Sequence, residues 1–169
     1  MQVGSHIPAL KVVKEAMRML GELGNKAKEA EAAMTLARLH NDATKLGDLR
    51  AAEAAKQAMQ LAKQLGDKGL EASATLEVGR AQLLQVKDMT TAQRAVEESL
   101  AAFKGLGDRR GEAAASEVLA KVHLAKMDTE PALKAAREAH SIYVSLKDEQ
   151  GIKSSLSTVE SVKASQYSV

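Results

Sequence analysis

Histidine is the residue type in this sequence best suited to bind a metal or to carry protons, and the chain has four. They are His6, His40, His123 and His140. No two of them have the HExxH spacing, which places two imidazoles one helical turn apart to bind zinc. His40 and His123 lie at equivalent places in the first and third copies of an internal repeat, so we expect no shared metal ion. We interpret both as half-buried polar residues of the packing.

Glycine and serine could supply a phosphate loop or a nucleophile. Gly105, Gly107 and Gly111 resemble a phosphate loop only in part, because no Gly-Lys-Ser/Thr ending follows them and no strand precedes them. No serine lies in a Gly-x-Ser-x-Gly elbow. The chain has no cysteine, which excludes disulfides, thiolate metal sites and cysteine nucleophiles. We therefore predict no catalytic residue, no metal and no cofactor, and an enzyme is the least favoured function class.

The composition favours an all-α protein of one domain or a short repeat array. The 169 residues are rich in alanine and leucine and include only two tyrosines and one phenylalanine, which favours helix over strand. With 24 basic and 22 acidic residues the net charge is +2, so no general attraction to nucleic acid or anionic membranes is expected. No apolar run approaches the ~20 residues needed to span a bilayer. Cytoplasmic and organellar locations fit the sequence equally well.

A short marker recurs four times along the chain at nearly equal intervals, which is the signature of an internal repeat. Its four copies are Leu23-Gly24-Asn25, Leu65-Gly66-Asp67, Leu106-Gly107-Asp108 and Leu146-Lys147-Asp148. Glycine ends a helix in the left-handed conformation and Asp or Asn caps the next helix, so each marker predicts a turn between helices. Leu46-Gly47-Asp48 also matches but falls in the middle of a repeat, and we interpret it as the turn inside the first one.

Each interval between markers has the apolar spacing of two helices, which we call the first and the second helix of a repeat. The predicted pairs are 26–45 with 49–64, 68–86 with 90–105, and 109–126 with 130–145. A lone helix at 8–22 precedes the repeats 23–64, 65–105 and 106–145, and a capping helix at 149–166 follows them. The sequence thus predicts a single domain over 1–169 with about eight helices, stacked as a right-handed α-solenoid of antiparallel helix pairs.

Small side chains recur on one face of each second helix and of the lone helix. The sets are Ala9, Val13 and Ala16; Ala51, Ala55 and Ala58; Ala92, Val96 and Ser99; and Ala132, Ala136 and Ala139. The first helices carry the pairs Leu36-Ala37, Val78-Gly79 and Leu119-Ala120 at equivalent places. Together these features resemble the tetratricopeptide repeat, in a variant whose period is longer than the usual one, over residues 8 to about 160.

The aromatic positions of that family are replaced in this chain. Its Trp-like positions hold Ala33, Thr75 and Ser116, and its Tyr-like positions hold His40, Gln82 and His123. A buried aromatic side chain covers about 150–250 Å², which is worth roughly 4–6 kcal/mol of burial. We therefore predict an alanine-rich, thin core, with either modest stability for the isolated chain or stability gained from a bound partner.

The resemblance implies that the first helices line a groove. Basic residues follow the small residue of each first helix, at Arg38, Arg80 and Lys121, and Asn41, Leu83 and Leu124 lie one turn further on. We predict that these six residues form a partner-binding groove for an acidic or extended segment, held by charge-assisted hydrogen bonds. The alternative is ordinary solvated charge, paired with Glu77, Glu117 or Asp42.

The helix at 8–22 is apolar over most of its circumference and lacks a first helix of its own. We predict that Leu10, Val13, Met17 and Leu20 form a docking edge for another protein; the alternatives are a fragment or a tolerated exposed arc. The helix at 149–166 is apolar on one stripe and serine-rich elsewhere, which is typical of a solubilising cap.

These features favour a non-enzymatic module or scaffold that binds another protein through its groove, its apolar edge or both. The alternative is a peripheral structural subunit of a large assembly, such as an organellar or photosynthetic membrane complex to which protein contacts would attach it. An RNA-binding helical repeat is disfavoured by the net charge and by the length of the repeat.

Overall fold

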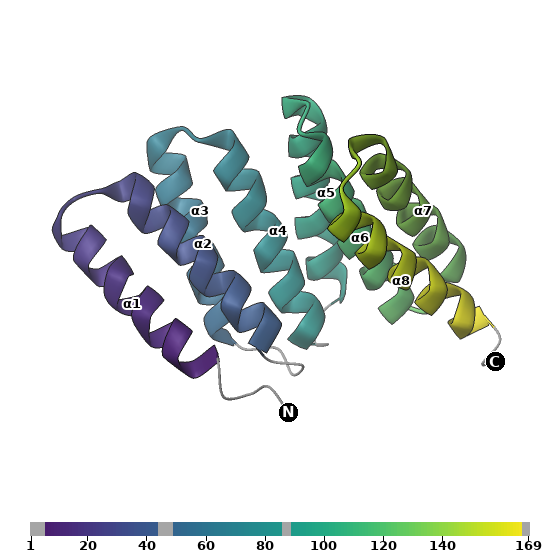
Figure 1. Ribbon diagram of the computed structural model, residues 1–169, viewed down its shortest axis with the longest axis horizontal. Coiled ribbons are helices and arrows are strands. Elements are labelled where there is room, and N and C mark those ends of the chain that lie inside the picture. The colour runs from purple at the N-terminus through teal and green to yellow at the C-terminus, as the bar shows by residue number, and fades with distance from the viewer. Residues whose placement is uncertain (1–5, 44–48, 86–88, 167–169) are drawn as a thin grey trace. The chain divides into compact units, whose positions relative to one another are not determined.

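The computed structural model describes residues 6–43, 49–85 and 89–166, and in these ranges the chain is all-α with no strand. Within residues 6–85 and within residues 89–166, successive helices pack side by side in antiparallel pairs (Figure 1). The eight helices are α1 His6–Glu22, α2 Lys26–Ala43, α3 Leu49–Leu65, α4 Lys68–Gln85, α5 Met89–Leu106, α6 Arg109–Ala125, α7 Thr129–Leu146 and α8 Glu149–Gln166. The all-α class, the helix count and the helix positions predicted from the sequence are therefore confirmed.

The contacts divide the chain into two compact units, residues 1–88 and 89–169. In the first unit each of α1 to α4 packs against the next, and α2 also contacts α4. In the second unit each of α5 to α8 packs against the next, and α6 also contacts α8. First helices of successive repeats thus touch each other within each unit, as in a helical repeat. The boundary between the units falls inside the predicted repeat 65–105.

The four markers form the turns that the sequence predicts. Gly24, Gly66 and Gly107 have φ of 67°, 70° and 69°, and Lys147 stands in the same conformation with φ of 55°. The next residue of each marker accepts a hydrogen bond from the backbone three residues ahead. These bonds run from Lys28 N to Asn25 Oδ1 (3.2 Å), Leu70 N to Asp67 Oδ1 (2.9 Å), Gly111 N to Asp108 Oδ1 (2.9 Å) and Gly151 N to Asp148 Oδ1 (3.0 Å). The match at Leu46-Gly47-Asp48 lies outside the described residues.

Lys147 is the one marker position with a side chain that opposes its backbone conformation. A left-handed residue other than glycine costs roughly 1 kcal/mol, because its Cβ crowds the following carbonyl oxygen. We expect Lys147→Gly to raise the free energy of unfolding by about 0.5–1 kcal/mol in urea titrations. Lys134→Gly, at an exposed site inside α7, is the matched control and should lower it by about 1 kcal/mol. A loss of stability in both variants would contradict this prediction.

The core consists largely of alanine, as predicted. The small ladders of the second helices are buried, with no exposed surface on Ala51, Ala55 and Ala58 in α3 or on Ala132, Ala136 and Ala139 in α7. Small side chains let neighbouring helix backbones approach closely, so the packing consists of many close contacts between small side chains and few between large ones.

Two of the three aromatic residues are nevertheless buried, and both lie on a glycine. Phe103 in α5 covers Gly111 in α6, and Tyr143 in α7 covers Gly151 in α8. A Cβ built on Gly111 would lie 2.3 Å from the Phe103 ring, and one on Gly151 would lie 2.2 Å from the Tyr143 ring. Each ring therefore occupies the space that a side chain would need at the start of the next first helix.

Candidate functional site

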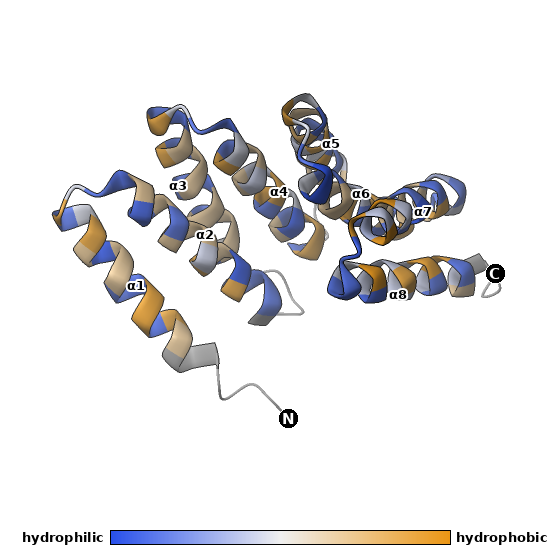
Figure 2. Ribbon diagram, turned by 45° about the horizontal axis from the view of Figure 1, so that its top comes forward, coloured by the Kyte–Doolittle hydropathy of each residue, from blue (hydrophilic) through white to orange (hydrophobic). Residues whose placement is uncertain are grey.

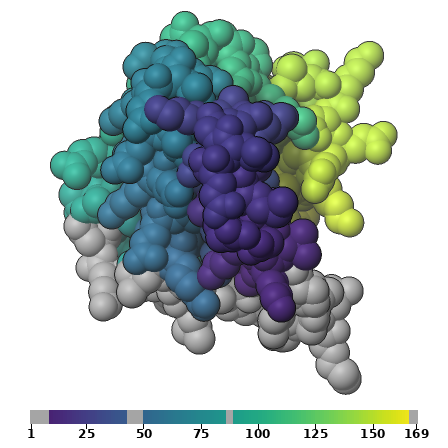
Figure 3. Space-filling model, turned by 90° about the vertical axis from the view of Figure 1, so that its left-hand side faces the viewer, coloured from purple at the N-terminus to yellow at the C-terminus, as the bar shows by residue number. Residues whose placement is uncertain are grey.

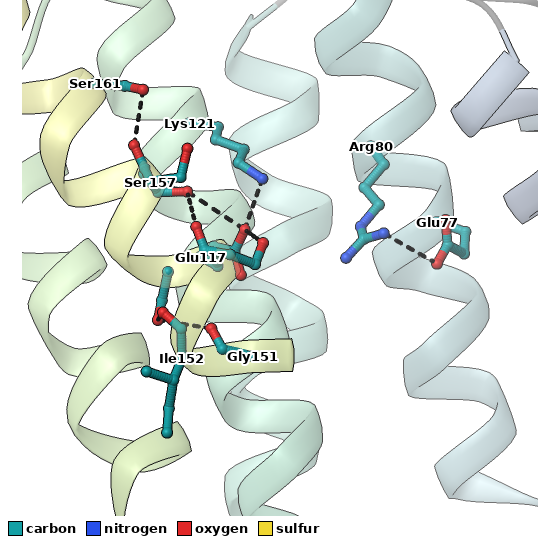
Figure 4. Close-up of polar contacts among 11 residues, drawn as sticks. Glu77, Arg80, Glu117, Lys121, Gly151, Ile152, Ser157 and Ser161 are labelled. Atoms are coloured by element: carbon teal, nitrogen blue, oxygen red, sulfur yellow. Dashed lines mark hydrogen bonds and ion pairs between the residues drawn. The ribbon is translucent and has the colours of Figure 1, made fainter. Parts of the chain in front are cut away.

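Four polar residues of α2 and α4 meet at one place in the first unit. We call this set, Arg38, Asn41, Glu77 and Arg80, the α2–α4 polar face. Asn41 Nδ2 donates to Glu77 Oε2 at 2.9 Å and to the Glu77 backbone oxygen at 3.3 Å. Arg38 Nε lies 3.5 Å and Arg80 Nη1 lies 3.8 Å from Glu77 Oε1, so two guanidinium groups from different helices converge on one carboxylate oxygen. Figure 4 shows the Glu77–Arg80 pair.

The burial of these groups differs sharply. The Glu77 side chain is only 5% exposed, whereas those of Arg38 and Arg80 are 57% and 37% exposed. A buried carboxylate is stable only when it is paired and hydrogen-bonded, and here three neighbours do this. The face carries two positive charges and one negative charge, so positive charge is in excess at its exposed part.

The second unit has a related but neutral arrangement around Glu117 of α6 (Figure 4). Lys121 Nζ lies 2.7 Å from Glu117 Oε1, and the hydroxyls of Ser154 and Thr158 on α8 donate to the same oxygen at 2.8 and 3.4 Å. One lysine and one buried glutamate cancel, so this cluster has no surplus charge. Its main effect is to join α6 to α8.

The structure brings together three of the six predicted groove residues. Arg38, Asn41 and Arg80 meet on the α2–α4 polar face, while Leu83 is partly buried on α4. Lys121 and Leu124 belong to the second unit, where Leu124 packs against the cluster that contains Ala120, Ala132 and Val162. The ion pairs with Glu77 and Glu117 that the sequence offered as an alternative are present, but both carboxylates are buried rather than solvated.

Glu77, which the sequence offers only as a solvated ion-pair partner, is the residue that contacts the other three. It lies between the buried residues Leu76 and Val78, in a stretch of α4 that is buried from Ala74 to Gly79. A charged residue between apolar residues of a helix is the signal in the sequence for a paired, buried carboxylate, because an ionised side chain is buried only when it has partners.

Helix α1 packs most of the predicted docking edge against its own unit. Leu10, Val13 and Met17 pack against buried residues of the chain's own core, including Leu36, and Leu20 is partly buried. The apolar residues of α1 that face outward are Val12 and Met19, which are 67% and 51% exposed. The apolar segments of α1 are visible in Figure 2.

A charged row runs along α1 beside these outward apolar residues. Arg18 forms ion pairs with Glu15 at 2.7 Å and with Glu22, and all three side chains are more than half exposed. The hydrogen bond and the charge of Arg18 hold the pKa of Glu15 below its ordinary value. This row has alternating charge and is typical of a solvated helix face.

The histidines lie apart from one another in the described ranges. His40 is buried in α2, His123 is 14% exposed with Nδ1 3.6 Å from Asp128 Oδ2, and His140 Nδ1 lies 3.1 Å from the Ser155 hydroxyl. Among the residues described, no group of three or more His, Asp or Glu side chains could hold a metal ion. None of the helices in these ranges is long and apolar enough to cross a membrane.

Comparison with known proteins gives no family assignment. The sequence matches no protein-family model, and it has no significant match among the curated proteins.

Proposed function

We propose that this chain is a non-enzymatic protein-binding module, similar to tetratricopeptide repeats, that holds an acidic, extended segment of a partner protein on the α2–α4 polar face. The observation that supports this is the convergence of Arg38 and Arg80 on Glu77 Oε1. Two guanidinium groups held next to each other leave donors and positive charge for a second carboxylate, which would come from the partner.

The two neighbouring guanidinium groups are suited to bind a carboxylate of the partner. Guanidinium groups bind carboxylates through paired, planar hydrogen bonds that are stronger than those between neutral groups. Glu77 balances one of the two guanidinium charges, so the face keeps one positive charge in excess for a partner. The neutral Glu117 cluster offers no such surplus, so the first unit is the proposed binding region.

A charge reversal at Arg38 tests this proposal. We expect Arg38→Glu to weaken the binding of a fluorescent peptide of alternating aspartate and serine at least about ten-fold, measured by anisotropy at low salt. Lys56→Glu, an exposed site on α3 with the same change of charge, is the control and should bind as the unaltered chain does. Equal affinity in all three proteins, or an equal loss in both variants, would contradict the proposal.

A second function, a structural subunit of a large assembly, is favoured by the outward apolar residues Val12 and Met19 of α1. A recruited module should purify as a stable isolated protein. A subunit that depends on its assembly should unfold or aggregate when isolated, and its thermal midpoint should rise only when the assembly partner is present. Static light scattering and thermal unfolding of the purified chain distinguish the two.

A further inference from the structure

Helix α1 carries an apolar surface that the described part of the chain leaves uncovered. We call Val12, Ala16 and Met19 the α1 flank; their spacing of i, i+4 and i+7 places them on one side of the helix. Val12 and Met19 are 67% and 51% exposed. In Figure 3, α1 is the outermost described helix on that side of the first unit.

The repeat itself shows what covers these positions elsewhere. Counted back from Leu106, the equivalents of the flank are Ala95, Ser99 and Ala102 in α5, of which Ser99 alone is buried. Counted back from Leu65 and Leu146, they are Ala54, Ala58 and Leu61 in α3 and Ala135, Ala139 and Ile142 in α7. All six are buried, with at most 9% exposure. In each case the preceding first helix, α2 or α6, packs alongside. The flank of α1 has the same place in the repeat, and its cover would be a helix of the same kind.

The residues that provide this cover are small. Ala33 and Ala37 of α2 lie in buried clusters with alanines of α3, and Ala113 and Ala120 of α6 lie in buried clusters with alanines of α7. Ala30 and Ser116 belong to the same rows, which are Ala30, Ala33 and Ala37 in α2 and Ala113, Ser116 and Ala120 in α6, all at most 1% exposed. Both sets have the spacing i, i+3 and i+7. A helix that covers Val12, Ala16 and Met19 therefore needs small residues at this spacing to approach closely enough.

The last helix of the chain does not meet this requirement. At the equivalent positions α8 carries Lys153, Leu156 and Glu160, all exposed. Burying Lys153 and Glu160 against an apolar flank would leave two charges without water or partners. Thus α8 of a second copy is a poor cover for α1, and the charges on α8 fit the predicted solubilising cap. The α1 flank has no such charges.

We propose that the α1 flank is the docking site for an amphipathic helix of another protein, which runs antiparallel to α1 and presents small residues at i, i+3 and i+7. The docked helix packs on α1 in the way that the first helix α2 packs on α3. This inference rests on the proposed protein-binding function but uses a surface separate from the α2–α4 polar face.

The absence of cysteine permits a direct test by disulfide cross-linking of the full chain. The probe is a synthetic peptide of residues 109–125 with Ala113→Cys, and the chain carries Met19→Cys. Ala113 lies in one buried cluster with Ile142, the equivalent of Met19, so docking brings the two thiols together. In a glutathione redox buffer, we expect at least ten-fold more cross-link at position 19 than with Glu15→Cys, an exposed site in the charged row of α1.

Peptide variants and the free chain decide between the outcomes. Adding Ser116→Lys and Ala120→Lys to the peptide should reduce cross-linking at position 19 to the Glu15→Cys level. Equal cross-linking at positions 15 and 19 would overturn the proposal. A second copy would be the cover if light scattering showed the unaltered chain to be a dimer and the Met19→Cys variant formed disulfides between chains. That result would also overturn the proposal. Neither result affects the Arg38→Glu test, so failure of the two proposals can be told apart.

Discussion

Replacing Gly111 by alanine should destabilise the protein, although alanine is the better helix former. The new Cβ would lie 2.3 Å from Cδ1 and 2.6 Å from Cγ of Phe103, whose side chain is nearly fully buried and cannot swing away. Overpacking of this kind costs about 1–3 kcal/mol, more than the ~1 kcal/mol that alanine gains in a helix. We expect Gly111→Ala to lower the free energy of unfolding by about 2 kcal/mol in urea titrations.

The control for this prediction is another helical glycine of the same unit. Gly105 in α5 has no atom within 4 Å of a built Cβ, so Gly105→Ala should raise the free energy of unfolding by about 0.5–1 kcal/mol. The first unit also suggests a rescue, because Ala62 and Leu70 stand where Phe103 and Gly111 stand in the second. Phe103→Ala combined with Gly111→Leu should be more stable than Gly111→Leu alone. Equal behaviour of Gly105→Ala and Gly111→Ala would refute the steric argument.

Replacing Glu77 by glutamine should lower the stability of the protein but strengthen its binding of an acidic peptide. The substitution keeps the size of the side chain but removes the negative charge that Arg38 and Arg80 share and that Asn41 hydrogen-bonds. Loss of a buried ion pair costs up to about 3–5 kcal/mol, but both arginines are more than a third exposed, so water screens part of this. We expect a decrease of about 1–2 kcal/mol in the free energy of unfolding.

The same variant should bind an acidic peptide more tightly. Without Glu77 the two guanidinium groups have no internal counter-charge, so affinity for the aspartate–serine peptide should rise several-fold, with a steeper dependence on salt. Glu98→Gln, at an exposed site of α5, changes the net charge equally and is the control. A fall in affinity for Glu77→Gln would show that Glu77 contributes to binding rather than competing with the partner.

The helices were the part of this fold most accessible to prediction. The predicted helix 109–126 is observed at Arg109–Ala125, and the predicted helix 130–145 at Thr129–Leu146. The C-terminal ends of both helices depend on local chemistry, because a left-handed residue follows each helix and an Asp directly precedes the next helix. Phe103 and Gly111 recur one period later as Tyr143 and Gly151, so the sequence also carries a signal for these two contacts between a ring and a glycine.

The candidate site was less accessible because its contacts are distant in sequence. Arg38, Asn41 and Arg80 all contact Glu77, which the sequence pattern offers only as a solvated partner. Asn41 lies 36 residues before Glu77, and Ser154 lies 37 residues after Glu117. The local sequence around each glutamate does not indicate which side of its helix the neighbouring repeat will cover.

The sequence alone determined that the chain forms helices, where they turn and how often the pattern repeats, because these properties depend on residues at most a few positions apart. Which side chains are buried depends on contacts between helices that are distant in sequence. Val12 and Ala54 hold equivalent places in similar helices, yet one is 67% exposed and the other 4%. The difference lies in the presence of a neighbouring helix, since burial is a property of the packed assembly and not of the helix that carries the residue.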